Sequence, residues 1–138
     1  MANLRVTVLG GGHWGMALAH LAARAGHDVT VWAREPEVVA GINEQHRNPL
    51  FLNEIDLPPN LGATAELGES VHEADMVLVV IPSQFVREHM VAVRDDLPPR
   101  IPIVICSKGI EQSTLCTMHQ VLKEELPGKH HEGISVLS

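Results

Sequence analysis

Apolar positions change their spacing repeatedly within the first 33 residues of the chain. Leu4 to Leu9 is a short, β-branched run that stops at three consecutive glycines, which predicts a buried strand. From Trp14 to Ala25 the apolar residues recur every three or four positions and Gly26 follows, which predicts a helix ending at a glycine. Asp28 to Ala33 returns to strand composition. Residues 4–33 therefore predict one βαβ unit with parallel strands.

The alternation of predicted strands and helices continues to the end of the chain. The aperiodic stretch from Arg47 to Asn60 predicts a long loop with apolar anchors. The other predicted elements are helices at 36–45, 70–74, 84–97 and 113–126, and strands at 63–67, 76–81, 101–106 and 134–137. Short strands alternating with helices predict an α/β fold with a doubly wound, mostly parallel sheet in the order 3-2-1-4-5-6, a Rossmann fold. We expect residues 1–138 to form this single domain.

Composition and charge narrow the range of partners. The chain has 10 Lys and Arg against 17 Asp and Glu, a formal charge of −7, and no basic cluster. We expect no nucleic-acid partner, because affinity for a duplex comes mainly from neutralised phosphates. The longest apolar runs, such as Met76 to Ile81, are much shorter than the ~20 residues of a membrane span, and residues 1–10 do not resemble a signal peptide. Two cysteines cannot form a disulfide framework, so we expect a reducing, cytoplasmic setting.

A glycine-rich turn separates the first predicted strand from the first predicted helix. Residues 10–15 read Gly-Gly-Gly-His-Trp-Gly and match the pattern G-x-G-x-x-G. In this setting Gly10 permits the tight turn, Gly12 lets backbone N–H groups approach a pyrophosphate, and Gly15 lets the helix pack on the strand. The helix N-terminus adds unpaired N–H donors and partial positive charge, so the predicted ligand is an anionic dinucleotide. The alternative is that the glycines serve only a sharp turn.

The end of the second predicted strand bears on which dinucleotide is bound. NAD-binding domains usually place an acid there to bond the ribose 2′-OH, whereas a basic residue accommodates the 2′-phosphate of NADP. This strand has no acid at Trp32 or Ala33, and Arg34 follows them. NADP is therefore the preferred cofactor, although Glu35 keeps NAD open. Arg34 could instead be a solvated charge at a strand end.

Four segments taken together resemble the bacterial NAD(P)-dependent glycerol-3-phosphate dehydrogenases. These are residues 10–19, 31–34, 81–84 and 107–111, and the last, Ser-Lys-Gly-Ile-Glu, is the most specific. The likeness covers essentially all 138 residues and departs from the family's frequent residues at Gly11 and His13. The resemblance implies reversible hydride transfer between NADPH or NADH and dihydroxyacetone phosphate. The product, sn-glycerol 3-phosphate, would feed glycerophospholipid synthesis in the cytoplasm.

Further candidate site residues follow the predicted fourth and fifth strands. Lys108 comes just after the fifth strand, at the edge where open α/β sheets bind ligands. A cation there can pair with a phosphate or polarise a carbonyl, and by the resemblance Lys108 contacts both the cofactor and the phosphorylated substrate. An exposed loop lysine is the alternative. Pro82 and Ser83 end the fourth strand, where the family's backbone passes the nicotinamide ribose, and Ser83 is equally a candidate helix N-cap.

Several other residues are open to more than one interpretation. His13 and Trp14 touch the cofactor by the family pattern, but Trp14 also fits an apolar plug between the first helix and the long loop. His130 and His131 are expected to lie in a solvated turn, and we expect no metal site. Cys106 is expected to be a buried strand residue, because no neighbour in the sequence is placed to activate it as a nucleophile.

In the resembling family a helical domain follows the sixth strand, supplies the lysine assigned as proton donor and acceptor, and makes most substrate contacts. We therefore expect this chain to be the cofactor-binding domain alone, with no catalytic residue of its own, weak NADP(H) binding and no dehydrogenase activity. A homodimer is an option for the full-length protein. Two other interpretations stay open: an NADP-dependent reductase resembling ketopantoate reductase, against which Ser107 to Glu111 argues, and a non-catalytic NADP(H)-sensing module.

Overall fold

A computed structural model describes residues 3–137 as alternating strands and helices. The ends of the predicted domain, residues 1–2 and 138, lie outside the described residues. The strands are β1 (Arg5–Leu9), β2 (Asp28–Trp32), β3 (Leu61–Thr64), β4 (Met76–Val79), β5 (Ile103–Ile105) and β6 (Ile134–Val136). The helices are α1 (His13–Arg24), α2 (Pro36–Gln45), α3 (Leu67–His72), α4 (Val86–Val93) and α5 (Met118–Glu125), with 3-10 turns η1 (Ser83–Phe85) and η2 (Gly128–Gly133).

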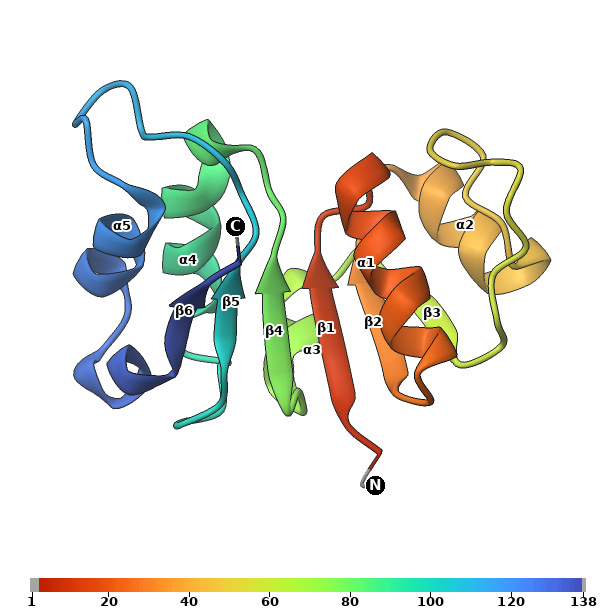
Figure 1. Ribbon diagram of the computed structural model, residues 1–138, viewed down its shortest axis with the longest axis horizontal. Helices are drawn as coiled ribbons and strands as arrows, with labels where there is room; N and C mark the ends of the chain where they lie inside the picture. The colour runs from red at the N-terminus through yellow and green to blue at the C-terminus, as the bar shows by residue number, and fades with distance from the viewer. Residues whose placement is uncertain (1–2, 138) are drawn as a thin grey trace.

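All neighbouring strands pair in parallel, in the order β3-β2-β1-β4-β5-β6, which confirms the predicted fold class and strand order. The central strand β1 pairs with β2 on one side and β4 on the other, so that Val8 lies opposite both Val31 and Leu78. Figure 1 shows the strand arrowheads at one common edge of the sheet. The chain order reverses between β1 and β4, and the carboxyl edge at such a switch point is where open α/β sheets form a ligand crevice.

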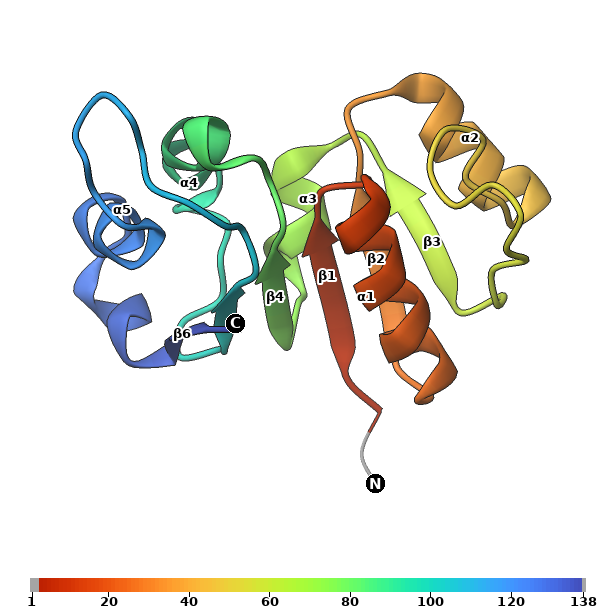
Figure 2. The same cartoon turned by 45° about the horizontal axis from the view of Figure 1, so that its top comes forward.

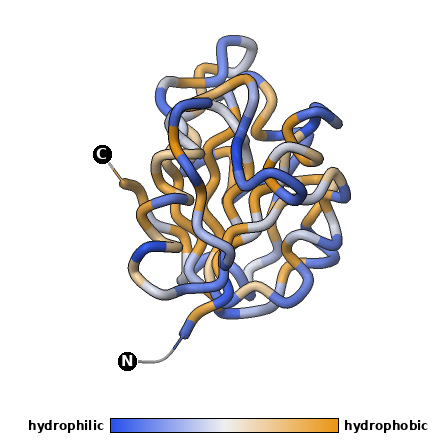
Figure 3. Tube along the Cα trace, turned by 90° about the vertical axis from the view of Figure 1, so that its right-hand side faces the viewer, coloured by the Kyte–Doolittle hydropathy of each residue, from blue (hydrophilic) through white to orange (hydrophobic). Residues whose placement is uncertain are grey.

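Helices cover both faces of the sheet. Helices α1 and α2 contribute Met16, Ala19, Val38 and Ile42 to one buried cluster with β1, β2 and β3, whereas α3, α4 and α5 pack on β4 and β5 in a second cluster. In Figure 1 α1 lies in front of the sheet and α3 behind it, and Figure 2 shows the same layers from a tilted direction. Hydrophobic segments run through the centre of the molecule in Figure 3, and the surrounding loops are mostly hydrophilic. This two-sided burial explains the almost continuous apolar run of β4.

Helix α5 begins later than the sequence predicts. The apolar spacing predicts a helix from Ser113, but residues 111–117 form a loop that is closed by an antiparallel bridge between Ile110 and Thr117. Thr117 then caps the helix, because its side chain accepts a hydrogen bond from the backbone N–H of Gln120 while the Gln120 side chain accepts one from the Thr117 N–H. This reciprocal capping box satisfies two N–H groups at the true start of the helix.

The predicted solvated turn at His130 and His131 is wrong for His130. This residue lies in η2 with its side chain fully buried, and neither ring nitrogen has a hydrogen-bond partner within residues 3–137. Burial lowers the pKa of the imidazole, and the neighbouring Lys129 charge lowers it further. A ring nitrogen of His131 lies 2.8 Å from the carbonyl of Leu126. The 3-10 turn η2 packs against β5, and no local pattern in the sequence reveals this long-range contact.

Residues 3–137 contain neither a candidate metal cluster nor a candidate membrane-spanning helix. No three His, Cys, Asp or Glu side chains gather there closely enough to hold a metal ion. The helices in this part of the chain are all too short or too polar to cross a bilayer.

Candidate functional site

Three glycines in the turn between β1 and α1 have different structural roles. Gly10 has a φ of +125°, and a Cβ there would lie 2.7 Å from the Val80 carbonyl oxygen. A Cβ on Gly15 would lie 2.0 Å from the carbonyl oxygen of Gly10, so this position lets the first helical turn press against the strand end. Gly12 is the N-cap of α1, and beyond its own chain neighbours no atom of residues 3–137 lies within 4 Å of the place where its Cβ would stand.

The N-terminus of α1 is open to a ligand. No side chain caps it, and its first turn contains no acidic residue. The uncapped N–H groups and the positive end of the helix dipole therefore face the space in front of Gly12 without a competing anion. Such a helix end favours a phosphate or a similar anion.

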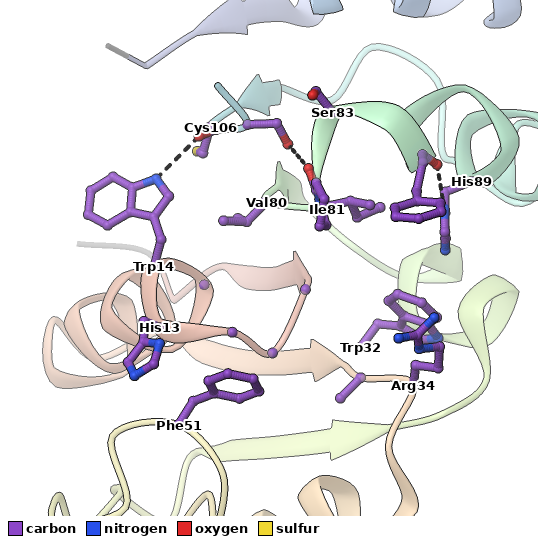
Figure 4. Close-up of a pocket in the computed structure, with 18 of the residues that line it drawn as sticks. His13, Trp14, Trp32, Arg34, Phe51, Val80, Ile81, Ser83, His89 and Cys106 are labelled. Carbon is purple, nitrogen blue, oxygen red and sulfur yellow. Dashed lines mark hydrogen bonds between the residues drawn. The ribbon is translucent and has the colours of Figure 1, made fainter. Parts of the chain in front are cut away.

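A cleft of about 790 Å³ runs along the carboxyl edge of the sheet, in front of this turn. One wall consists of residues 10–15 and the end of β2, and the facing wall consists of residues 80–83 and 106–108. Figure 4 shows the two walls across the opening, with His13 and Trp14 on one side and Ile81 and Ser83 on the other. This volume lies within the usual range for small-molecule and cofactor sites.

All residues that the sequence singles out for cofactor or substrate contact line this one cleft. They are Gly10, Gly12, His13, Trp14, Gly15, Arg34, Pro82, Ser83 and Lys108. They come from four separate strand ends or helix starts, so the fold alone brings them together. Their individual roles toward a ligand stay predictions.

Trp14 does not plug the space between α1 and the long loop. Its side chain is about half exposed, and its indole N–H donates to the carbonyl of Cys106 at 3.2 Å, on the opposite wall of the cleft. His13 contacts the loop instead, with its ring edge-on to Phe51 at a centroid distance of 5.0 Å. The two neighbouring side chains therefore point in different directions from the helix start, as Figure 4 shows.

Arg34 extends from the end of β2 into the cleft region, with most of its side chain exposed. The charged group nearest to its guanidinium is Glu35, at 3.7 Å. The wall beside it contains Trp32, whose ring packs edge-on against His89 of α4 at a centroid distance of 5.0 Å. Arg34 is thus a largely exposed cation that lies beside the Trp32 and His89 rings.

Lys108 is also exposed, and its amino group makes no hydrogen bond or ion pair with the described residues. Its neighbour Ser107 is anchored, because the hydroxyl donates to the carbonyl of Ile81 at 2.5 Å. Ser83, which faces Lys108's other neighbour Gly109, makes no capping hydrogen bond to the following helix. The N-cap alternative for Ser83 is therefore wrong.

Cys106 is buried directly after β5, as the sequence predicts. Burial raises the pKa of its thiol, which keeps the sulfur protonated and poorly nucleophilic. Its part in the cleft is the backbone carbonyl that accepts the Trp14 hydrogen bond.

Asn48 and Phe51 belong to the long loop, where the sequence predicts apolar anchors but assigns neither residue a role at the site. The Asn48 amide is buried, donates to the Gly11 carbonyl at 3.1 Å, and accepts from the N–H groups of Leu50 and Phe51 at 3.0 Å each. The Asn48 side chain thus connects the loop to the glycine turn and holds the backbone at Phe51, whose ring contacts His13. An Asn before a proline inside an otherwise aperiodic loop is the signal that could have drawn attention to this position.

A glycine turn that leads into an open helix N-terminus, at the switch point of a 3-2-1-4-5-6 sheet, defines a dinucleotide-binding domain of the Rossmann class. Comparison with protein families agrees with this class. Residues 5–138 match the family described as NAD-dependent glycerol-3-phosphate dehydrogenase N-terminus, so the chain belongs to this family. The resemblance found in the sequence is thereby confirmed.

Individual relatives support the same assignment. The chain is 48% identical over 122 residues to a glycerol-3-phosphate dehydrogenase [NAD(P)+] of Rhodospirillum rubrum, covering 88% of this chain and 35% of the relative. It is 50% identical over 123 residues to the enzyme of the same name from Paramagnetospirillum magneticum, covering 89% of this chain and 44% of that one. The chain therefore spans less than half the length of these relatives.

Solved structures show the same domain. A glycerol-3-phosphate dehydrogenase from Coxiella burnetii superposes with a TM-score of 0.83 at 27% identity, over 90% of this chain and 38% of that one. A ketopantoate reductase from Ralstonia eutropha is more distant, with a TM-score of 0.73 at 23% identity over 96% of this chain and 40% of that one, and shares the fold alone.

Proposed function

We propose that residues 1–138 are the cofactor-binding domain of a glycerol-3-phosphate dehydrogenase that binds NADPH in preference to NADH. The observation that carries the proposal is the uncapped N-terminus of α1, fronted by Gly12 with nothing within 4 Å of its absent side chain. That arrangement leaves room for a pyrophosphate to approach the backbone N–H groups. The family of the chain supports the choice of a nicotinamide dinucleotide.

Different groups of cleft residues would contact different parts of a bound nicotinamide dinucleotide. The α1 N-terminus would hold the pyrophosphate, while Arg34 at the end of β2 would meet the 2′-phosphate of the adenosine ribose. His13, Trp14, Pro82 and Ser83 would line the path between the adenosine and nicotinamide ends. When bound, the nicotinamide ring supplies or accepts the hydride.

Lys108 would contact both the bound cofactor and the phosphorylated substrate. Its ammonium, which has no partner among the described residues, lies on the same carboxyl edge of the sheet, where it can attract the phosphate of dihydroxyacetone phosphate or stabilise negative charge on a carbonyl oxygen. We assign no proton-transfer residue to this chain. The chain by itself should bind NADPH without turning over dihydroxyacetone phosphate, and measurable turnover would contradict this part of the proposal. Cytoplasmic location and a homodimer of the full-length protein stay predictions.

The preference for NADPH is tested by Arg34→Asp. Removing the guanidinium and adding a carboxylate should weaken NADPH binding by about 10- to 100-fold, since a charged hydrogen bond to phosphate contributes roughly 1.5–3 kcal/mol. Binding of NADH should change little or improve. Fluorescence titration of the chain with both cofactors measures the ratio of the two dissociation constants.

Arg24→Asp is the matched control, because it makes the same charge change at the far end of α1, where the arginine is exposed and outside the cleft. It should leave the ratio of dissociation constants unchanged. A ratio that Arg34→Asp also leaves unchanged would refute the assignment of Arg34 to the 2′-phosphate.

A further inference from the structure

Arg87 joins helix α4 to the segment that carries Lys108. Its guanidinium donates from Nε to both carboxylate oxygens of Glu111, at 3.1 and 3.0 Å, and from Nη2 to one of them at 2.9 Å. The same guanidinium donates to Glu125 at 2.5 Å and to Glu124 at 3.4 Å, both on α5. One side chain thus connects α4, α5 and the loop after β5.

The pair between Arg87 and Glu111 is sheltered from water. The Glu111 side chain is only 8% exposed and that of Arg87 26%, and the Thr114 hydroxyl also donates to the Glu111 carboxylate at 2.5 Å. Hydrogen bonds from Arg87 lower the pKa of Glu111, and those to Glu111 and Glu125 raise the pKa of Arg87. A forked, shielded pair of this kind fixes the relative position of two backbones more strictly than an exposed ion pair does.

The backbone around Lys108 is fixed at both ends. On one side the Ser107 hydroxyl is bonded to carbonyls at the end of β4. On the other side Gln84 donates to the Ile110 carbonyl at 2.9 Å and accepts from the Gln112 N–H at 3.0 Å, next to the Glu111 contact with Arg87. Residues 107–112, the Lys108 segment, are therefore held at Ser107 and at 110–112.

We propose that Arg87 is a positioning residue that sets where Lys108 meets the ligands of the cleft, acting through Glu111. Arg87 itself does not line the cleft, and its forked pair with Glu111 connects it to the segment that carries Lys108. Its α4 neighbours Glu88 and His89 do line the cleft, so the test has to separate a route through α4 from the route through Lys108. The Lys108 amino group has no partner among residues 3–137 to orient it, which leaves its location to the backbone anchors on either side. The proposal rests on the proposed function, because it assigns Lys108 a ligand to contact.

A double-mutant cycle tests this role. Arg87→Lys keeps a positive charge among the three glutamates, which preserves the fold, but a lysine cannot form the fork. Lys108→Ala should raise the dissociation constant for NADPH about 10-fold, the loss of one charged contact, and Arg87→Lys should raise it about 3-fold or more. In the Lys108→Ala background, Arg87→Lys should then change the constant by less than about 2-fold, because its effect runs through Lys108.

Two further variants complete the experiment. Glu111→Gln removes the other half of the pair while leaving Arg87 bonded to Glu124 and Glu125, and it should behave as Arg87→Lys does. Arg94→Lys is the matched control, since Arg94 also pairs with Glu125, at 3.8 Å, without touching the Lys108 segment. It should leave NADPH binding unchanged.

The outcomes separate this inference from the proposed function. Equal effects of Arg87→Lys with and without Lys108, or no effect in either background, overturn the positioning role even if the chain binds NADPH well. A wild-type chain that binds neither NADPH nor NADH overturns the proposed function. Amide hydrogen exchange then decides the positioning by itself: Arg87→Lys should accelerate exchange at residues 110–112 but not in β5, and unchanged exchange there refutes it.

Discussion

His130 is a buried histidine whose ring nitrogens find no partner in the described part of the chain, at the turn that leads into β6. A neutral imidazole tolerates this environment better than a charged one, because burial lowers its pKa. The native chain therefore takes up this proton at lower pH than the unfolded chain does. Acid should favour unfolding through this residue.

The contribution of His130 to the free energy of unfolding should be nearly constant above about pH 6.5. At lower pH this contribution should decrease, by up to ~1.4 kcal/mol per pH unit. His130→Leu should remove that part of the decline. Urea unfolding at pH 7.5 and 5.5 measures the difference. His72→Gln, at an exposed histidine, is the control. A decline that survives His130→Leu would show that other groups cause it.

Asn48 holds the long loop against the glycine turn through three hydrogen bonds of one buried amide. Asn48→Ala should lower the free energy of unfolding by about 2–3 kcal/mol, because it leaves buried N–H and carbonyl groups without partners. It should also weaken NADPH binding, since Phe51 loses its anchor beside His13. Asn53→Ala, at an exposed position of the same loop, should change neither quantity. Urea unfolding and NADPH titration provide the two measurements.

At the scale of elements, two glycines of the turn between β1 and α1 should affect different properties. Gly15 should matter mainly for stability, and Gly12 mainly for ligand binding. Gly15→Ala would drive a Cβ into the Gly10 carbonyl and should cost about 3 kcal/mol of stability. Gly12→Ala meets no protein atom, so it should cost about 1 kcal/mol or less as a poorer N-cap. Even so, the added methyl should weaken NADPH binding at least ~10-fold by occupying the approach to the helix N-terminus.

Thermal unfolding and NADPH titration of both variants test this separation. A Gly12→Ala chain that keeps wild-type affinity for NADPH would show that the dinucleotide does not approach this helix end. Gly15→Ala serves as the internal comparison, because its steric conflict lies inside the protein rather than at the ligand.

Elements were predictable where local pattern decides them. Strands β1, β2, β4 and β5 follow from β-branched runs, and the glycine turn follows from spacing alone. Strand β3, Leu61–Thr64, contains a glycine and begins two residues before the predicted 63–67. The start of α5 was not predictable from apolar spacing, because a bridge between Ile110 and Thr117 keeps the residues before Met118 in a loop. The Glu111 contact with Arg87, 24 positions away, anchors the same loop. The contact of Asn48 with Gly11 spans 37 positions, and His130 is buried by packing that local periodicity does not encode.

On the scale of the whole molecule, ligand binding and folding should be linked. A ligand that binds only the native chain at 100 times its dissociation constant adds about 2.7 kcal/mol to the free energy of unfolding. For a domain of this size NADPH should then raise the melting temperature by about 8–10 °C. Scanning calorimetry measures the shift. The Gly12→Ala chain at the same NADPH concentration is the control, and an equal shift there would place the binding elsewhere.

The walls of the cleft come from residues between Gly10 and Lys108, on both sides of the reversal between β1 and β4. During synthesis on a ribosome, the first βαβ unit can leave the exit tunnel long before the second wall has been made. The nascent chain at that stage has a glycine turn but no enclosed space around it. Capture of the dinucleotide therefore follows the early steps of co-translational folding and cannot guide them.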